Sequence, residues 1–267
     1  MAEEKKKVRI DVGDGAAIPS KSDKGLFSAW LLSFFLAVGA LLLLLFYPDP
    51  EVSDKYQEIL VFLADGIVIT FQVTLSSIAI AIVIGFFTGL GRLSKIWIIN
   101  LIASTYVEVV RGIPLLVQLF YLYYAIGEFI KMPDMVAAIM AMSICYGAYM
   151  GEVFRAGIDS IDQGQTEAAR SLGFNGAQTM MYVILPQAWR TILPPVGNEF
   201  IALLKDTSLV SILGVADLLR RGREYASTSF DYFQTYTLVA IIYLIITLIL
   251  SKLVSKMEER LGQHDQR

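Results

Sequence analysis

The sequence predicts an all-α protein that crosses a membrane several times, and three features support this prediction. Hydrophobic residues make up 55% of the 267 positions and charged residues only 18%, which is too little charge for the surface of a soluble domain. Eleven charged residues lie in the first 25 positions and seven in the last 16. Between these ends, uncharged stretches of about 20 residues, the length of a transmembrane helix, alternate with short polar connections.

Residue counts exclude several kinds of chemistry. The one cysteine, Cys145, lies in an apolar run and permits neither an intrachain disulfide nor a thiolate metal cluster. The one histidine, His264, is close to the C-terminus, so we expect neither a Ser-His-Asp triad nor a zinc ion bound by histidines. No P-loop sequence occurs, and a net charge of −3 disfavours nucleic acid as a partner. We therefore expect no enzyme activity, metal or cofactor in this chain itself.

The first predicted membrane helix covers residues 26–47, a run of 22 without a charge. At 1.5 Å per residue this run is long enough for a hydrocarbon core of about 30 Å. A cleaved signal peptide is the alternative. It fits poorly, because the apolar region of a signal peptide is roughly 7–15 residues long and the sequence PDPEVSD follows instead of small residues. We expect a retained helix that follows a charged tail at residues 1–25.

Five further spans are predicted, at residues 66–91, 96–126, 135–151, 191–216 and 232–251. Gly85, Gly89 and Gly91 near the end of the second span predict close packing against neighbouring helices. The third span is unusual because it contains charged residues and Pro114. Between the fourth and fifth spans, residues 156–190 are polar and read as a loop with short helices.

The distribution of Lys and Arg in the connections predicts the orientation. Six of these residues precede the first span, two follow the second and four follow the sixth, whereas residues 48–60 hold one lysine among four acids. Both termini are therefore expected in the cytoplasm. One connection disagrees, since Arg220, Arg221 and Arg223 would lie outside.

The polar segment at residues 164–187 predicts two short helices that meet at an angle. Glu167 favours the beginning of the first helix and Gly173 its end. Asn175 is a suitable N-cap for the second helix, which we expect to run until Pro186 breaks it. Local physics alone leaves an ordinary amphipathic connector as an equal alternative.

This segment resembles the EAA signature of ABC-importer permease subunits: Glu-Ala-Ala, three residues, Gly, nine residues, then Ile-x-Leu-Pro. The matching positions are Glu167, Ala168, Ala169, Gly173, Val183 (in place of Ile), Leu185 and Pro186. Three further runs are similar to the polar amino acid (histidine/glutamine/arginine) branch of these permeases: EVVRGIPLLVQLF (108–120), GEVFRAGIDSIDQGQ (151–165) and LPPVGNEFIALLKDTSLVS (193–211). The resemblance covers about residues 60–257.

The resemblance implies a type I ABC-importer permease core of five transmembrane helices at 60–257, preceded by one extra helix and followed by a cytoplasmic tail at 258–267. It implies a coupling region at 164–186 that docks into a separate ATPase, with Glu167, Ala168, Ala169, Gly173, Leu185 and Pro186 as coupling residues. The implied partners are an ATPase dimer that binds the ATP, a second permease subunit (identical or related) and an extracytoplasmic amino-acid-binding protein. Such a complex would move polar amino acids across the bacterial inner membrane by alternating access.

A secondary transporter or channel, driven by an ion gradient through acids within the membrane, is the alternative function. Ionisable residues at membrane depth are functional candidates in either case. Glu108 and Arg111, and likewise Glu152 and Arg155, are spaced i, i+3 and could neutralise each other as structural pairs.

Arg111 is the better candidate for contact with a substrate, because Gly112 and Pro114 loosen the helix after it and Gln118 is expected further along the same face. An amino acid needs a cation for its carboxylate and acids or carbonyls for its ammonium group. The residues predicted to line the substrate pathway are Arg111, Gln118, Glu152, Asn198, Glu199 and Asp206.

Overall fold

The structure is a computed structural model that describes residues 28–262, and all regular secondary structure within this range is helical. The predicted tail at 1–25, the start of the first predicted span and His264 lie outside the described residues. In chain order the elements are α1 (Ala29–Leu45), α2 (Pro50–Arg92), α3 (Trp97–Gly112), α4 (Leu115–Phe120), the π-helical turn η1 (Tyr121–Ala125), α5 (Asp134–Asp159), α6 (Gln163–Ser171), α7 (Gly176–Thr179), the π-helical turn η2 (Met180–Ile184), α8 (Leu185–Asp206), the 3₁₀ helix η3 (Thr207–Leu213), α9 (Leu218–Ser229) and α10 (Tyr232–Gly262).

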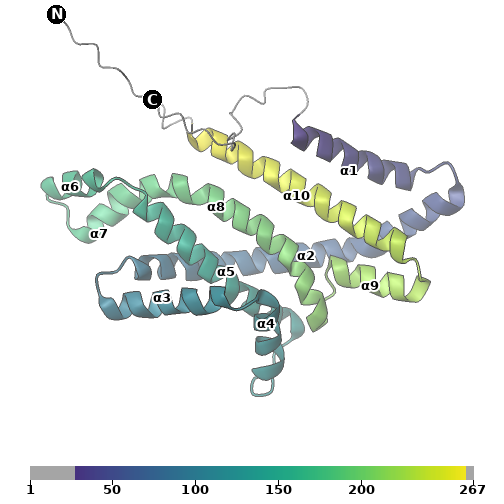
Figure 1. Cartoon of the computed structure of the whole chain (residues 1–267), viewed down its shortest axis with the longest axis horizontal. Helices are drawn as coiled ribbons and strands as arrows, with labels where there is room; N and C mark the ends of the chain where they lie inside the picture. The colour runs from purple at the N-terminus through teal and green to yellow at the C-terminus, as the bar shows by residue number, and fades with distance from the viewer. Residues whose placement is uncertain (1–27, 263–267) are drawn as a thin grey trace, which may run out of the picture.

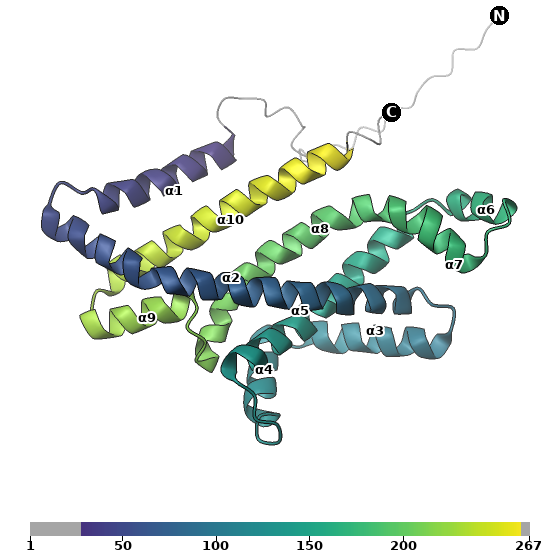
Figure 2. The same cartoon turned by 180° about the vertical axis from the view of Figure 1, so that it is seen from behind.

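The long helices lie side by side and alternate in direction (Figure 1). The short helices α6 and α7 lie together at one end of the molecule and α9 lies at the other, as the view from behind also shows (Figure 2). Because the directions alternate, the beginning of α1 and the end of α10 both lie toward the end that carries α6 and α7.

Within residues 28–262, three helices, α2, α5 and α10, are long and apolar enough to cross a membrane. α3 followed by α4 and η1 makes a fourth if this bent pair counts as one span. α1 is apolar but has 17 residues instead of the predicted 22. α8 replaces the fifth predicted span; it begins at Leu185 and carries four charged residues, and η3 continues the chain after it.

The prediction of one continuous third span at 96–126 is wrong, because the helix axis turns by 102° between α3 and α4. The turn lies at Ile113, whose ψ of 129° is extended, directly before Pro114. A proline disfavours the helical conformation of the residue before it, and this local effect ends α3 at Gly112.

The prediction that α2 would begin near residue 66 is also wrong, since this helix has 43 residues and begins at Pro50. Its start is well specified: the Asp49 side chain accepts a hydrogen bond from the Glu51 N–H, and Pro50 occupies the first turn. The added turns bury Ile59 and Leu63 against α9 and α10, which extends the helix beyond its apolar part.

The contact between α2 and α5 forms the centre of the molecule and confirms the packing predicted from the glycines. A Cβ atom at Gly89 would lie 2.7 Å from the Cβ atom of Phe154, and one at Gly85 would overlap Met150. Small residues let two helix backbones approach closely, which increases van der Waals contact where lipid supplies no hydrophobic drive. A large side chain at either glycine would force these helices apart.

The extra helix α1 packs on the outside of this core. At its first turn the Trp30 indole N–H donates to the Leu248 carbonyl of α10, with 2.9 Å between nitrogen and oxygen. At its other end the Gln57 side chain of α2 donates to the Leu45 carbonyl at 2.9 Å. α1 is therefore held at one end by α10 and at the other by α2.

Candidate functional site

The protrusion made by α6 and α7 is closed by specific capping interactions, as predicted. α6 ends in a Schellman motif, in which the Phe174 N–H donates to the Ala169 carbonyl (3.1 Å) and Gly173 takes a left-handed φ of 86°. Asn175 then caps α7 in a reciprocal capping box with Gln178, each bond measuring 2.9 Å. Nothing lies within 4 Å of a Cβ atom placed at Gly173, so glycine is required there for its backbone conformation.

The predicted helix break at Pro186 is wrong. α7, η2 and α8 follow one another without an intervening loop from Gly176 to Asp206. Pro186 is tolerated because it lies in the first turn of α8, directly after the π-helical turn that ends at Ile184. The tip of the protrusion is therefore joined to the membrane region by one unbroken helical segment.

The surface of the protrusion combines small and large side chains. Of the predicted coupling residues, Glu167, Ala168 and Pro186 are exposed, Leu185 is half-buried and Ala169 is buried. Four large apolar side chains are exposed around them: Leu172 (79%), Phe174 (37%), Met181 (65%) and Tyr182 (68%). Sequence reasoning missed these four, although apolar residues in a polar segment outside the membrane were the available signal. Such an exposed apolar group is typical of a surface that docks against another protein.

A second candidate site lies between α3, α5 and α8. The Arg111 guanidinium lies over the Tyr149 ring, 5.2 Å from its centroid. The Tyr146 hydroxyl donates to the Asp206 carboxylate at 2.7 Å. Glu199, seven residues before Asp206 on α8, is half-buried and within electrostatic range of both Arg111 and Asp206. Three of the six predicted pathway residues are thus brought together around two tyrosines that sequence reasoning missed.

The other predicted pathway residues lie elsewhere. Gln118 is on α4, and its amide donates to the Val110 and Ile113 carbonyls, both at 2.7 Å. It therefore satisfies carbonyls that the bend exposes, and the expectation that it continues the Arg111 face is wrong. Asn198 is exposed on α8, next to Glu199 in the chain.

Glu152 belongs to a separate group of ion pairs, nearer the α6 end. It pairs with Arg155 as predicted, the Arg155 Nε lying 3.1 Å from Glu152 Oε1, and also with Arg92 of α2. The possible pair between Glu108 and Arg111 does not form. Glu108 lies 4.0 Å from Arg92 and its side chain is 79% exposed, whereas Arg111 turns toward α5.

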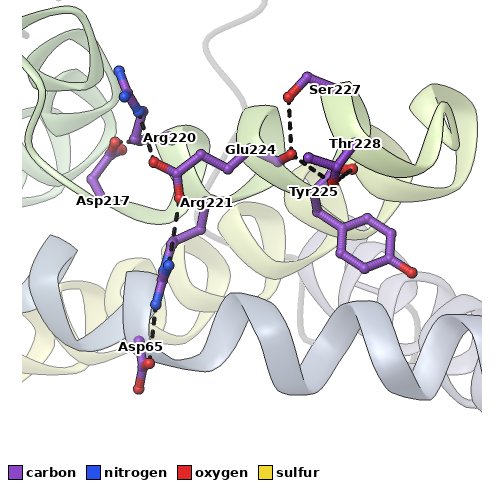
Figure 3. A network of polar contacts seen from close by, with 8 residues as sticks. All are labelled: Asp65, Asp217, Arg220, Arg221, Glu224, Tyr225, Ser227 and Thr228. Carbon is purple, nitrogen blue, oxygen red and sulfur yellow. Dashed lines mark hydrogen bonds and ion pairs between the residues drawn. The ribbon is translucent and has the colours of Figure 1, made fainter.

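The helix α9 at the opposite end contains all three arginines that disagree with the predicted orientation. Figure 3 shows two of them, Arg220 and Arg221. Arg220 pairs with Glu224 at 2.9 Å, and Arg221 bridges Glu224 at 3.4 Å and Asp65 of α2 at 3.2 Å. The hydrogen bond from Arg220 is the main reason why the pKa of Glu224 lies below its ordinary value. Local carboxylates therefore neutralise much of this positive charge.

Asp217 fixes the beginning of α9. Its buried carboxylate accepts hydrogen bonds from the Leu219 and Arg220 N–H groups at 3.1 and 3.0 Å. Burial raises the pKa of this carboxyl from 3.8 to about 6, despite the opposing effect of those hydrogen bonds. Within residues 28–262 no group of three or more His, Cys, Asp or Glu side chains could hold a metal ion.

Membrane-crossing helices, a capped protrusion at one end and charged residues gathered between the helices define a multi-pass transport protein. Residues 81–262 match the family of binding-protein-dependent transport system inner membrane components, and the chain belongs to this family.

Named relatives agree with this assignment. The glutamine transport system permease protein GlnP of Escherichia coli (strain K12) is 38% identical over 202 residues, covering 74% of this chain and 92% of that protein. The L-cystine transport system permease protein TcyB of Bacillus subtilis (strain 168) is 38% identical over 204 residues, covering 76% and 87%. The crystal structure of an amino acid ABC transporter with histidines is similar with a TM-score of 0.73 and 42% identity, covering 79% of this chain and 98% of that one.

Membership of the family makes this chain a multi-pass permease subunit of an ABC importer in the inner membrane, which works with an ATPase and a substrate-binding protein. These relatives give no support to the alternative of a gradient-driven secondary transporter or channel. The family match begins at residue 81, so α1 and the first part of α2 lie outside it.

Proposed function

We propose that this permease moves polar amino acids into the cytoplasm by alternating access, and that a dimer of ATPases drives it through the α6–α7 protrusion. The observation that carries the proposal is the continuous rod of α7, η2 and α8. This rod joins the protrusion at Gly176 to the acidic residues Glu199 and Asp206 within the membrane region. A push on the protrusion would act on the polar cluster through this continuous helical segment.

The chemistry of the protrusion suits docking into a cleft of the ATPase. Ala168 is small and exposed, which allows close approach, while Leu172 and Tyr182 offer apolar surface to bury. The Schellman motif at Gly173 fixes the angle at which the tip is presented. ATP would be bound by that partner, and this chain would contribute no cofactor site.

A second permease subunit, identical or related, would cover one face of α8. The exposed positions Thr191, Pro195, Asn198 and Lys205 share one helical face, at i, i+4, i+7 and i+14. A polar face of this kind is unsuited to lipid, because polar groups in a bilayer face a protein interior or a water-filled path. This face would complete the translocation pathway between the two subunits.

The polar cluster has the charges that an amino acid requires. Arg111 would hold the α-carboxylate, and Glu199 and Asp206 would face the ammonium group. Support for amino acids as the substrate class comes from the relatives, which are named for glutamine and L-cystine, and from the amino acid transporter of known structure.

The orientation proposed is cytoplasmic for α6, α7 and both termini. The α9 end would then face the extracytoplasmic amino-acid-binding protein. The distribution of Lys and Arg in the connections supports this orientation. The positive charges near residues 220–223 argue less strongly against it, because Arg220 and Arg221 are paired with carboxylates.

Transport by the reconstituted complex tests the proposal. Proteoliposomes containing the permease, its ATPase and its binding protein are loaded with ATP on the ATPase side and assayed for uptake of radiolabelled glutamine, cystine and arginine. We expect uptake that needs both ATP and the binding protein and that survives collapse of ion gradients by ionophores. Uptake by the permease alone, driven by an imposed proton or sodium gradient, would contradict the proposal.

A further inference from the structure

The polar cluster between α3, α5 and α8 carries more negative than positive charge. Its charged members are Arg111, Glu199 and Asp206, so one positive and two negative charges give a net charge of −1 when all are ionised. Within residues 28–262, no Lys or Arg side chain lies within the 4.0 Å of an ion pair from Glu199 or Asp206. Neither carboxylate is therefore neutralised by a cation of the described chain.

Glu199 is the carboxylate of this cluster that has no bonded partner. It is half-buried on α8, and the described part of the chain offers it neither a hydrogen bond nor an ion pair. Arg111 acts on it only electrostatically from beyond 4.0 Å, because its guanidinium lies over the Tyr149 ring. An unpaired carboxylate within the membrane region is costly, so Glu199 is a candidate for contact with a positive group that the substrate brings.

Asp206 provides a second and separate position for a positive group. The Tyr146 hydroxyl donates to this carboxylate at 2.7 Å and orients it toward α5. Glu199 and Asp206 are seven residues apart on α8, so they share one face of the helix and lie about 10 Å apart along its axis. Two carboxylates at this separation suit two different positive groups of one ligand.

An amino acid with a neutral side chain would balance only part of this charge. Its α-carboxylate would pair with Arg111 and its α-ammonium group with one of the two acids, which leaves the other acid unpaired. A positive charge at the end of the side chain would pair with that remaining acid. Lysine, with its four-carbon stem, and arginine both carry such a charge well away from the α-ammonium group.

We propose that this site selects amino acids with a cationic side chain. Arg111 binds the α-carboxylate, Asp206 the α-ammonium group, and Glu199 the guanidinium or ammonium group of the side chain, each through charge-assisted hydrogen bonds. The inference rests on the proposed function, whose substrate site it uses, and it names the class of amino acid.

Direct binding of two amino acids of nearly equal size tests the inference. A binding protein would select substrates before they reach the permease, so the purified complex of permease and ATPase is used without it. Radiolabelled arginine is compared with citrulline, in which a neutral ureido group replaces the guanidinium. We expect the parent to bind arginine roughly tenfold to a hundredfold more tightly, the usual effect of a hydrogen bond to a charged group.

The variant E199Q separates the side-chain contact from the rest of the site. It keeps the size of the residue and removes its charge, so the affinity for arginine should fall to that for citrulline, and citrulline should bind as in the parent. Retained citrulline binding shows that the variant is folded. The matched control E108Q removes a carboxylate on α3 whose side chain is 79% exposed, and it should keep the preference of the parent for arginine.

Three outcomes would overturn the inference: equal affinity of the parent for arginine and citrulline, binding of neither, or an equal loss of both in E199Q. ATP-driven uptake by the complete complex, measured alongside, distinguishes these outcomes from failure of the proposed function. Uptake of neutral amino acids with equal affinities would overturn the preference alone, whereas absence of any ATP-driven amino acid uptake would overturn the proposed function as well.

Discussion

At the scale of single residues, spacing in the sequence identified which charges could meet, but packing decided which do. Glu108 and Arg111 are one turn apart, and yet Arg111 lies over Tyr149 because α5 presents an aromatic face to that side of α3. The pair Glu152–Arg155 could be predicted because both partners lie on the same continuous helix. The contribution of Arg92 to that pair could not, since it comes from α2, 60 residues earlier in the chain.

Arg111→Ala should abolish uptake while the complex still assembles and basal ATPase activity remains. Loss of a charge-assisted contact to the carboxylate costs about 1.5–3 kcal/mol, a roughly ten- to hundredfold loss of affinity. Arg111→Lys should recover only part, because a point charge replaces a two-pronged donor. Uptake and ATP hydrolysis are measured on the same reconstituted preparations.

The double variant E108Q/R111Q is the control for a structural role. Because Glu108 and Arg111 are not paired, removing both charges should leave transport as impaired as R111A does. Restored transport in this variant would mean that Arg111 serves only to neutralise Glu108.

Gly173→Val should weaken binding of the ATPase and abolish uptake without affecting membrane insertion. The left-handed conformation costs a residue other than glycine about 1–2 kcal/mol, and a β-branched side chain more. Gly173→Asn is the matched control, because asparagine tolerates this conformation and should retain much of the coupling. Co-purification of the ATPase with each variant gives the readout, and normal coupling by G173V would refute the assignment of the protrusion.

At the scale of elements, helix ends with local capping signals could be predicted, and ends decided by neighbouring turns could not. Gly173 and Asn175 stop and restart the chain through their own backbone and side-chain preferences. The two prolines at predicted helix breaks have opposite effects on the chain. Pro114 separates α3 from α4, whereas Pro186 continues a helix because η2 precedes it, and no residue pattern announced a π-helical turn there.

The cap of α9 should make stability depend on pH. With its pKa raised from 3.8 to about 6, Asp217 stabilises the folded state fully below pH 3.8, and this contribution is lost as the pH rises through 6. Asp217→Asn keeps a good cap without that charge, so its melting temperature should exceed that of the parent increasingly from pH 5 to pH 7. Asp217→Ala removes the cap and should cost about 1 kcal/mol. A constant difference between D217N and parent across this range would exclude the buried carboxylate as the cause.

At the scale of the whole molecule, composition and the positive charges of the connections predicted a multi-pass helical protein, and the family match agrees with that prediction. The apolar run at 191–216 predicted a span that overlaps α8, but the bounds of this helix could not be predicted, because it begins at Leu185 and carries four charged residues. Only the packing of α8 against α5 and α10 shows where it lies. The polar cluster around Arg111, Glu199 and Asp206 likewise depends on three helices that are distant in sequence.

Reporter fusions test the proposed orientation. A reporter after Asp54, near the start of α2, should be active outside the cytoplasm, and one after Asn175, at the protrusion, should be active inside. The start of α2 and the start of α7 lie at opposite ends of the molecule (Figure 1). Reporters on the same side would contradict the topology, and a mature N-terminus near residue 48 would show that α1 is cleaved.

The glycine contact between α2 and α5 limits how this permease can move. Where backbones meet at Gly85 and Gly89, no flexible side chains separate the helices, and sliding by even a part of a turn would bring Cβ atoms into collision. We therefore expect α2 and α5 to move together as one rigid unit. We expect access to alternate through movement of other helices relative to this rigid pair. The chain would flex at the bend at Ile113, and the continuous helical segment from Gly176 to Asp206 would move with the ATPase.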